Sequence, residues 1–130
     1  MQDFRLTALV TLATVVLHFM LAWNVGRARV KFGVKAPAVS GNADFERVYR
    51  VQMNTIETTF MFMPALWLFA IYMSGLWAAA LGAVWIFARI WYAIAYARDA
   101  ARRGPAFGLS MLAVVALGVG AAWGVVREFI

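Results

Sequence analysis

Three long stretches of this chain contain no charged residue: residues 6–26, 58–88 and 104–126. A helix crosses the hydrocarbon core of a bilayer in about 20 residues, so the first and third stretches can each span a membrane once. The middle stretch is longer and contains Met73-Ser74-Gly75, which is typical of a tight turn, so it should hold parts of two spans. The sequence therefore predicts four transmembrane helices, near residues 5–26, 46–73, 76–100 and 106–127, joined by loops at 27–45 and 101–105.

The composition supports a membrane protein. Of the 130 residues, 65% are hydrophobic and 14% are charged, whereas a soluble domain usually carries about 25% charged residues. The first stretch is expected to be a retained span, because it is too long for a secretory signal, MQDFR is not clearly basic, and no small-x-small cleavage site follows. We expect one all-α integral membrane domain over residues 1–130.

Positive charges gather in two of the segments between the spans. Those in or near the loop at 27–45 are Arg27, Arg29, Lys31, Lys35, Arg47 and Arg50, and those in or near the loop at 101–105 are Arg98, Arg102 and Arg103. By the positive-inside rule, both segments are predicted to be cytoplasmic and both termini to lie on the opposite side. The net charge of +6 therefore reflects topology, and no nucleic-acid partner is expected.

Cysteine is absent and His18 is the only histidine. Cysteine nucleophiles, disulfides, thiolate metal sites and His-rich metal sites are therefore excluded. His18 lies in the middle of the first span, where we interpret it as a hydrogen-bonded packing residue. Any thiol chemistry must come from a ligand, and no metal is expected.

Glu57 and Arg89 are charged residues that lie within the predicted membrane. Measured along each helix from the turn at Ser74-Gly75, Glu57 stands about 25 Å and Arg89 about 21 Å away. The hydrocarbon core is about 30 Å thick, so both charges lie in its cytoplasmic half. Charges at such depth are costly and face the bundle interior or a wet cavity. A structural ion pair between the two is one interpretation, and a functional site is the other.

Polar residues near these two charges form stripes that favour the functional interpretation. Residues 47, 50, 54 and 57 fall within roughly an 80° arc of the second helix. Arg89, Tyr92 and Tyr96 share a face of the third helix. Arg103 also lies on this face if the helix continues that far. The alternative for Tyr96 is a place in the aromatic belt at the membrane interface. Guanidinium groups suit planar anions, and a carboxylate suits an ammonium group. The stripes predict a pocket open toward the cytoplasm for a small, zwitterionic, multiply anionic ligand.

The same residues resemble a known family. The run FERVYRVQMNTIE (residues 45–57) matches, at every fixed position, the signature E-R-V-x-R-x-Q-x-N-x-x-E of the MAPEG family, the membrane-associated proteins in eicosanoid and glutathione metabolism. The run FARIWYAIAYARDAARR (residues 87–103) is similar to a second family landmark, an arginine followed by paired tyrosines and a later arginine. Length and the number of spans also agree, so the resemblance covers nearly the whole chain.

The resemblance implies a left-handed four-helix bundle that assembles as a homotrimer, with glutathione bound as co-substrate between subunits. By position, the residues that resemble the family's glutathione-binding set are Arg29, Arg50, Gln52, Asn54, Glu57, Tyr92 and Tyr96. Arg103 is similar to the family arginine that stabilises the glutathione thiolate and is the expected catalytic residue. Arg47 and Arg89 are expected to support the site.

The sequence departs from the leukotriene-synthase branch at Val30, where that branch has a second arginine, and at Thr58, where it has a tyrosine. The resemblance therefore implies a bacterial microsomal-type glutathione transferase of the inner membrane. It would act in detoxification on hydrophobic electrophiles held near residues such as Trp23, Trp91, Phe107 and Met111, with glutathione peroxidase activity left open.

Two alternatives remain: a non-catalytic lipid- or ligand-binding member of the family, and a small four-helix multidrug transporter. The transporter is disfavoured because such proteins carry their glutamate in the first helix, which has none here.

Overall fold

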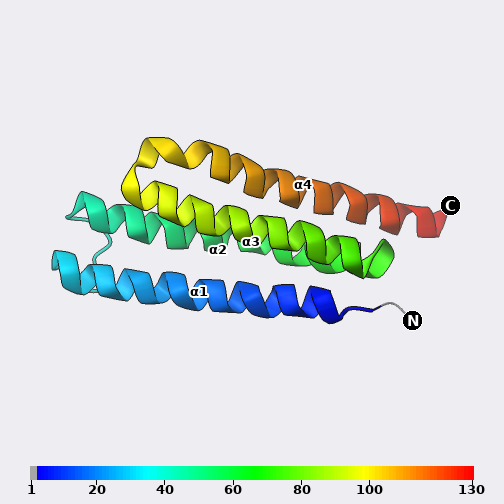
Figure 1. Ribbon diagram of the computed structural model, residues 1–130, viewed down its shortest axis with the longest axis horizontal. Coiled ribbons are helices and arrows are strands. Elements are labelled where there is room, and N and C mark those ends of the chain that lie inside the picture. Colours follow the sequence, from blue (N-terminus) through cyan, green and yellow to red (C-terminus); the bar gives the residue numbers. More distant parts are fainter. Residues whose placement is uncertain (1–2) are drawn as a thin grey trace.

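The computed structural model describes residues 3–130, and these form four long helices that run side by side (Figure 1). They are α1 (Arg5–Phe32), α2 (Ala43–Tyr72), α3 (Gly75–Arg98) and α4 (Gly104–Val126). A short 3-10 turn, η1 (Ala100–Arg103), joins α3 to α4, and a second, η2 (Arg127–Phe129), follows α4. The prediction of an all-helical chain with four helices long and apolar enough to cross a membrane is confirmed.

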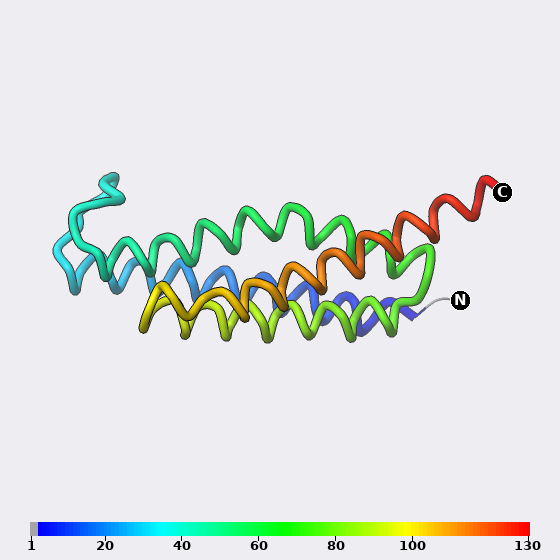
Figure 2. Tube along the Cα trace, turned by 90° about the horizontal axis from the view of Figure 1, so that it is seen from above, coloured from blue at the N-terminus to red at the C-terminus, as the bar shows by residue number. Residues whose placement is uncertain are grey.

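The start of α1 and the C-terminus lie at the same end of the bundle, as an even number of helices requires (Figure 1). The opposite end carries the 33–42 connector and η1, and we call it the basic end. Figure 2 shows α4 running obliquely across the bundle, from beside α3 at the basic end to the far end, where Arg127 Nη2 donates to the Tyr72 carbonyl at 2.6 Å. The four helices thus run alternately between the two ends of the bundle.

Local signals set the helix ends. Gly33 adopts a left-handed conformation (φ 68°) and ends α1, as glycine commonly does. The Asn42 side chain accepts a hydrogen bond from the Phe45 backbone N–H at 3.0 Å and starts α2. Ser74 accepts from the Trp77 N–H at 3.3 Å and starts α3 directly after the predicted turn. The connector is therefore confined to residues 33–42, because α1 continues past residue 26 to Phe32.

The third helix ends earlier than its predicted boundary at residue 100. Asp99 is extended, and its side chain accepts from the Ala101 backbone N–H at 2.9 Å, which starts η1 instead of prolonging α3. Arg103 therefore does not belong to the face of α3 that carries Arg89, Tyr92 and Tyr96. Arg103 lies at the end of η1, and the turn decides where its side chain goes.

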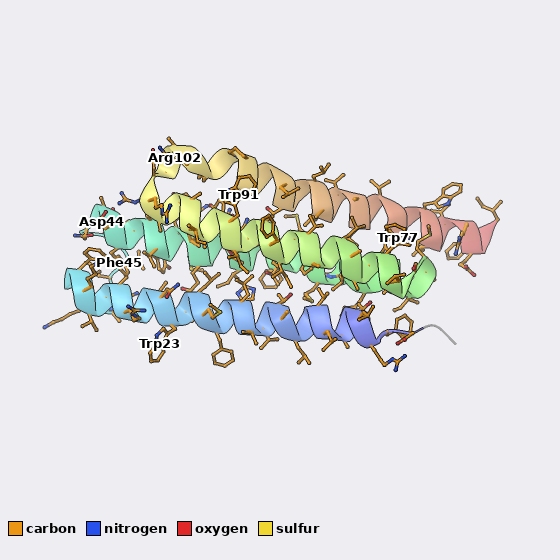
Figure 3. All side chains as sticks on the ribbon, in the orientation of Figure 1. Trp23, Asp44, Phe45, Trp77, Trp91 and Arg102 are labelled. Atoms are coloured by element: carbon orange, nitrogen blue, oxygen red, sulfur yellow. The ribbon has the colours of Figure 1, made fainter. Side chains whose placement is uncertain are left out.

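Large apolar side chains occupy both the core and the surface. Inside, Phe62 and Trp85 stack with ring centroids 3.9 Å apart, and both are fully buried. Outside, Phe19 and Trp23 on α1 and Phe60 on α2 are 73%, 71% and 79% exposed, and Figure 3 shows Trp23 pointing away from the bundle. An apolar surface of this extent needs lipid or protein against it. The fold thus suits an integral membrane protein.

Gly82 lets α3 approach α1 and α2 closely. A Cβ at this position would lie 2.7 Å from Val10 Cγ1 and 3.0 Å from Leu66 Cδ1. Gly82→Leu is therefore expected to lower the free energy of unfolding by about 1–3 kcal/mol through overpacking. Thermal unfolding in detergent, followed by circular dichroism, measures this. Gly118→Leu is the control, because no atom lies within 4 Å of a Cβ there; equal loss in both variants would refute the close-packing argument.

Candidate functional site

Arg89 is the centre of a buried polar cluster that joins three helices. It is fully buried and extends from α3. Its Nε and Nη2 donate to Thr55 Oγ1 at 3.3 and 2.8 Å, and Nη2 also donates to Asn54 Oδ1 at 2.8 Å. Its Nη1 donates to Ser110 Oγ of α4 at 3.3 Å. A buried guanidinium in a membrane helix requires such acceptors, and here α2 and α4 supply them.

The contact with Arg89 determines which group of the Asn54 amide, the oxygen or the NH₂, is free to bind a ligand. A guanidinium group only donates hydrogen bonds, so the amide oxygen must face Arg89. The amide NH₂ of Asn54 is therefore the part left to donate elsewhere. Thr55 Oγ1 gives its own proton to the Val51 carbonyl at 2.8 Å, which leaves its lone pairs for Arg89. Arg89 thus orients Asn54 and does not serve as the partner of Glu57.

Glu57 is paired with Arg50 on its own helix. Arg50 Nη1 donates to Glu57 Oε1 at 3.3 Å, and both side chains are 53% exposed. The interpretation of Glu57 and Arg89 as a structural ion pair is therefore wrong, because Arg50 reaches along the shared stripe to the carboxylate. A half-exposed pair of this kind is held weakly. Its two members can separate to bind a carboxylate and an ammonium group of a ligand.

Two tyrosines and Arg103 continue the cluster toward the basic end. The Arg89 guanidinium lies 4.1 Å from the centre of the Tyr92 ring, and the Tyr92 and Tyr96 ring centroids are 5.5 Å apart. The Arg103 guanidinium lies 5.3 Å from the centre of the Tyr96 ring, and its Nη1 donates to the Ala100 carbonyl at 2.7 Å. The η1 turn thus folds Arg103 back over Tyr96, although α3 ends at Arg98.

Three other residues expected at the site lie apart from this cluster. Arg29 donates to the carbonyls of Val34 and Ala38 at 3.3 and 2.7 Å, so it holds the connector against α1. Arg47 forms an ion pair with Asp44 at the start of α2. Gln52 is half-buried and makes no side-chain hydrogen bond to any of residues 3–130. Within one chain, then, the cluster brings together Arg50, Asn54, Glu57, Arg89, Tyr92, Tyr96 and Arg103.

Thr55 and Ser110 are not among the residues that the sequence predicted for the site. Thr55 is fully buried beside the polar stripe, and Ser110 is the only side chain with a hydroxyl, amide or charge in the apolar stretch 104–126. A single hydroxyl in an otherwise apolar transmembrane helix could have indicated that Ser110 bonds to a polar residue of another helix. Such a polar side chain stabilises membrane helices by bonding across to a neighbour.

Replacing Arg89 by lysine is expected to destabilise the bundle by about 1–3 kcal/mol, because the groups it leaves unpaired are buried. A single ammonium group lacks the fork that reaches acceptors on two helices at once. Thermal unfolding in detergent measures the loss. Arg102→Lys is the control, since Arg102 is exposed and its ion pair with Asp99 spans 3.9 Å; an Arg89→Lys midpoint equal to that of the control would contradict the bridging role.

These observations define a class: a four-helix membrane protein with a polar site built from α2, α3 and η1 around a buried arginine. The chain belongs to the MAPEG family, whose model matches residues 7–123. The family resemblance of its α2 and α3 motifs is thereby confirmed. Within residues 3–130, no three His, Asp or Glu side chains lie close enough together to hold a metal ion.

Relatives cover nearly the full chain. It is 52% identical to an uncharacterized protein of Synechocystis, over 88% of this chain and 83% of that protein. It is 38% identical to microsomal glutathione S-transferase 2 of Mus musculus, over 98% of this chain and 87% of the relative. It is 37% identical to leukotriene C4 synthase of Bos taurus, over 99% and 86% respectively.

Proposed function

We propose that this protein is a membrane glutathione transferase that activates the glutathione thiolate for attack on lipophilic electrophiles. The observation that carries the proposal is the Arg50–Glu57 pair at 3.3 Å beside the oriented amide of Asn54. Glutathione has two carboxylates, an ammonium group and a thiol, which matches a guanidinium, a carboxylate and an amide donor. Family membership and the names of two relatives support the same activity.

In the proposed complex Arg50 binds a glutathione carboxylate and Glu57 binds the ammonium group. The Asn54 NH₂ group donates to a carbonyl or carboxylate oxygen, and the phenols of Tyr92 and Tyr96 close the pocket toward the basic end. Gln52 and Arg29 lie apart from the cluster within one chain, so we propose that an adjacent subunit contributes them in a homotrimer. The basic end would face the cytoplasm of a bacterial cell, with both termini across the inner membrane.

Arg103 is the proposed catalytic residue. A nearby guanidinium favours the ionised sulfur and so lowers the pKa of the glutathione thiol. The thiol proton leaves to solvent, and the thiolate forms a C–S bond with the electrophilic carbon. In a substitution, the leaving group departs with the electron pair of its bond to carbon; in an addition, the neighbouring carbon takes up a proton. Positioning and charge stabilisation are the enzyme's contribution.

The two departures from the leukotriene-synthase branch favour a general transferase over a dedicated synthase. Val30 is 86% exposed and offers no charge. Thr58 is buried, and its hydroxyl donates within α2 toward the Asn54 and Thr55 carbonyls at 3.1 and 3.2 Å, so it cannot replace a phenol.

Phe107, whose ring lies 6.2 Å from that of Tyr92, is the aromatic residue best placed to contact an electrophile. Reduction of lipid hydroperoxides by two glutathione molecules is a proposed side activity.

Titration calorimetry of the detergent-purified protein with glutathione tests the proposal, together with conjugation assays on halogenated aromatics, unsaturated aldehydes and hydroperoxides. Binding followed by conjugation is expected. Absence of glutathione binding would overturn the proposal. Binding without turnover of any substrate would favour the non-catalytic ligand-binding alternative.

A further inference from the structure

An open cavity lies at the basic end, lined by residues of α1, α2 and α3. Its volume is about 530 Å³. Its walls are Asn24, Arg27, Ala28, Lys31, Phe32, Asp44, Val48 and Ala97. None of these residues belongs to the site around Arg89, and α4, which carries Ser110 of that site, contributes no wall. The cavity is therefore separate from the proposed glutathione site.

The charges around this cavity favour an anion. Arg27 and Lys31 project from α1, and neither forms an ion pair with a carboxylate of residues 3–130. The Lys31 ammonium lies 5.2 Å from the centre of the Phe32 ring, a contact that leaves its three donors available. Asp44 is the one acidic wall residue, and Arg47 neutralises it. The Asn24 amide adds further donors.

Apolar surface continues from the cavity in two directions. A smaller cavity of about 100 Å³ shares Asn24, Val48 and Ala97 with it and extends among Leu21, Val51 and Ala93. Arg27 also lines a groove of about 490 Å³ on the outer face of α1, whose other walls are Phe19, Ala22, Trp23, Gly26 and Val30. A polar opening joined to an apolar groove suits an amphiphile better than a soluble anion.

The depth of the cavity agrees with this chemistry. Val48 stands about 39 Å and Ala97 about 33 Å along their helices from the Ser74–Gly75 turn, at 1.5 Å per residue. The hydrocarbon core is about 30 Å thick, so the cavity lies at the level of the lipid headgroups. Basic pockets between transmembrane helices at this level are known to bind anionic headgroups.

We propose that this cavity binds the headgroup of an anionic phospholipid from the leaflet at the basic end. Arg27 and Lys31 bind the phosphate oxygens, and Asn24 donates to the phosphate or glycerol oxygens. The acyl chains extend from the cavity into the hydrocarbon core of the bilayer. A bound lipid would thereby hold the basic end of α1 against α2 and α3, beside the connector.

The test compares phosphatidylglycerol with phosphatidylcholine of the same acyl chains, added to the full chain in neutral detergent. Binding is read by native mass spectrometry and by the thermal unfolding midpoint. Phosphatidylglycerol is expected to bind the wild type and raise its midpoint, and to bind the Arg27→Gln/Lys31→Gln variant at least about tenfold more weakly. Arg98→Gln/Arg102→Gln is the matched control, because it removes two positive charges at the same end but outside the cavity. This control is expected to bind like the wild type.

Ala97→Phe provides a second variant that fills the cavity without changing charge, and it should weaken phosphatidylglycerol binding as well. Glutathione binding, expected to be unchanged in the cavity variants, reports that their fold is intact. Equal loss in both double variants would overturn the proposal in favour of general electrostatic attraction. Equal binding of the two lipids, or binding of inorganic phosphate as tight as that of the lipid, would also overturn it.

Discussion

Arg103→Ala is expected to lower kcat for glutathione conjugation by about 10²-fold, the usual effect of removing one group that stabilises a reacting anion. Arg103 lies over Tyr96 at the end of η1, and its guanidinium is the proposed partner of the thiolate. Without it the pKa of the bound thiol rises, because the ionised sulfur loses a nearby positive charge. The loss of rate should therefore shrink as the pH is raised.

Stopped-flow measurement of thiolate absorbance and steady-state conjugation rates, both as a function of pH, test this prediction. Arg102→Ala is the matched control, since Arg102 is the adjacent, exposed arginine and pairs only loosely with Asp99. Arg103→Lys should restore part of the rate, because it keeps a positive charge. An Arg103→Ala enzyme with wild-type rate and thiolate pKa would show that another group activates the thiol.

Arg50→Ala and Glu57→Gln are each expected to raise the Kd for glutathione by about 10- to 100-fold. Each removes a charge-assisted hydrogen bond to the ligand, worth about 1.5–3 kcal/mol. Stability should change little, because the Arg50–Glu57 pair is half-exposed and such pairs contribute about 0–1 kcal/mol. The prediction is therefore a loss of binding without a loss of fold.

Titration calorimetry gives the Kd values, and the thermal midpoint reports the fold. Arg98→Ala and Glu128→Gln are matched controls, since both residues are exposed and lie outside the site. The double variant should lose less than the sum of the single losses, because the unpaired charge that each single variant leaves is then also removed. Unchanged Kd values in both single variants would remove Arg50 and Glu57 from the proposed site.

Local sequence signals were sufficient for the number of helices and for the turn between α2 and α3, but the ends of α1 and α3 differ from the predicted ones. Ser74 acts on its own backbone neighbourhood, so the tight turn before α3 could be predicted without knowledge of packing. Gly33 and Asn42 are equally local signals, and they narrow the predicted 27–45 loop to residues 33–42. The apolar stretches determined the membrane setting, because a surface such as that of Phe19 and Trp23 must face lipid or protein. The α2 and α3 motifs identified the family.

Partner choice among polar side chains depended on the tertiary structure. Helical spacing put Glu57 and Arg89 at similar depth, but the rotation and tilt of α3 against α2 and α4 turned Arg89 toward Asn54, Thr55 and Ser110. Likewise, the cap at Asp99 ended α3 and brought Arg103 to Tyr96 through η1. Sequence periodicity fixes a residue's face and height on its own helix. Which neighbour it meets depends on how the helices pack, and that packing sums many weak contacts between distant parts of the chain.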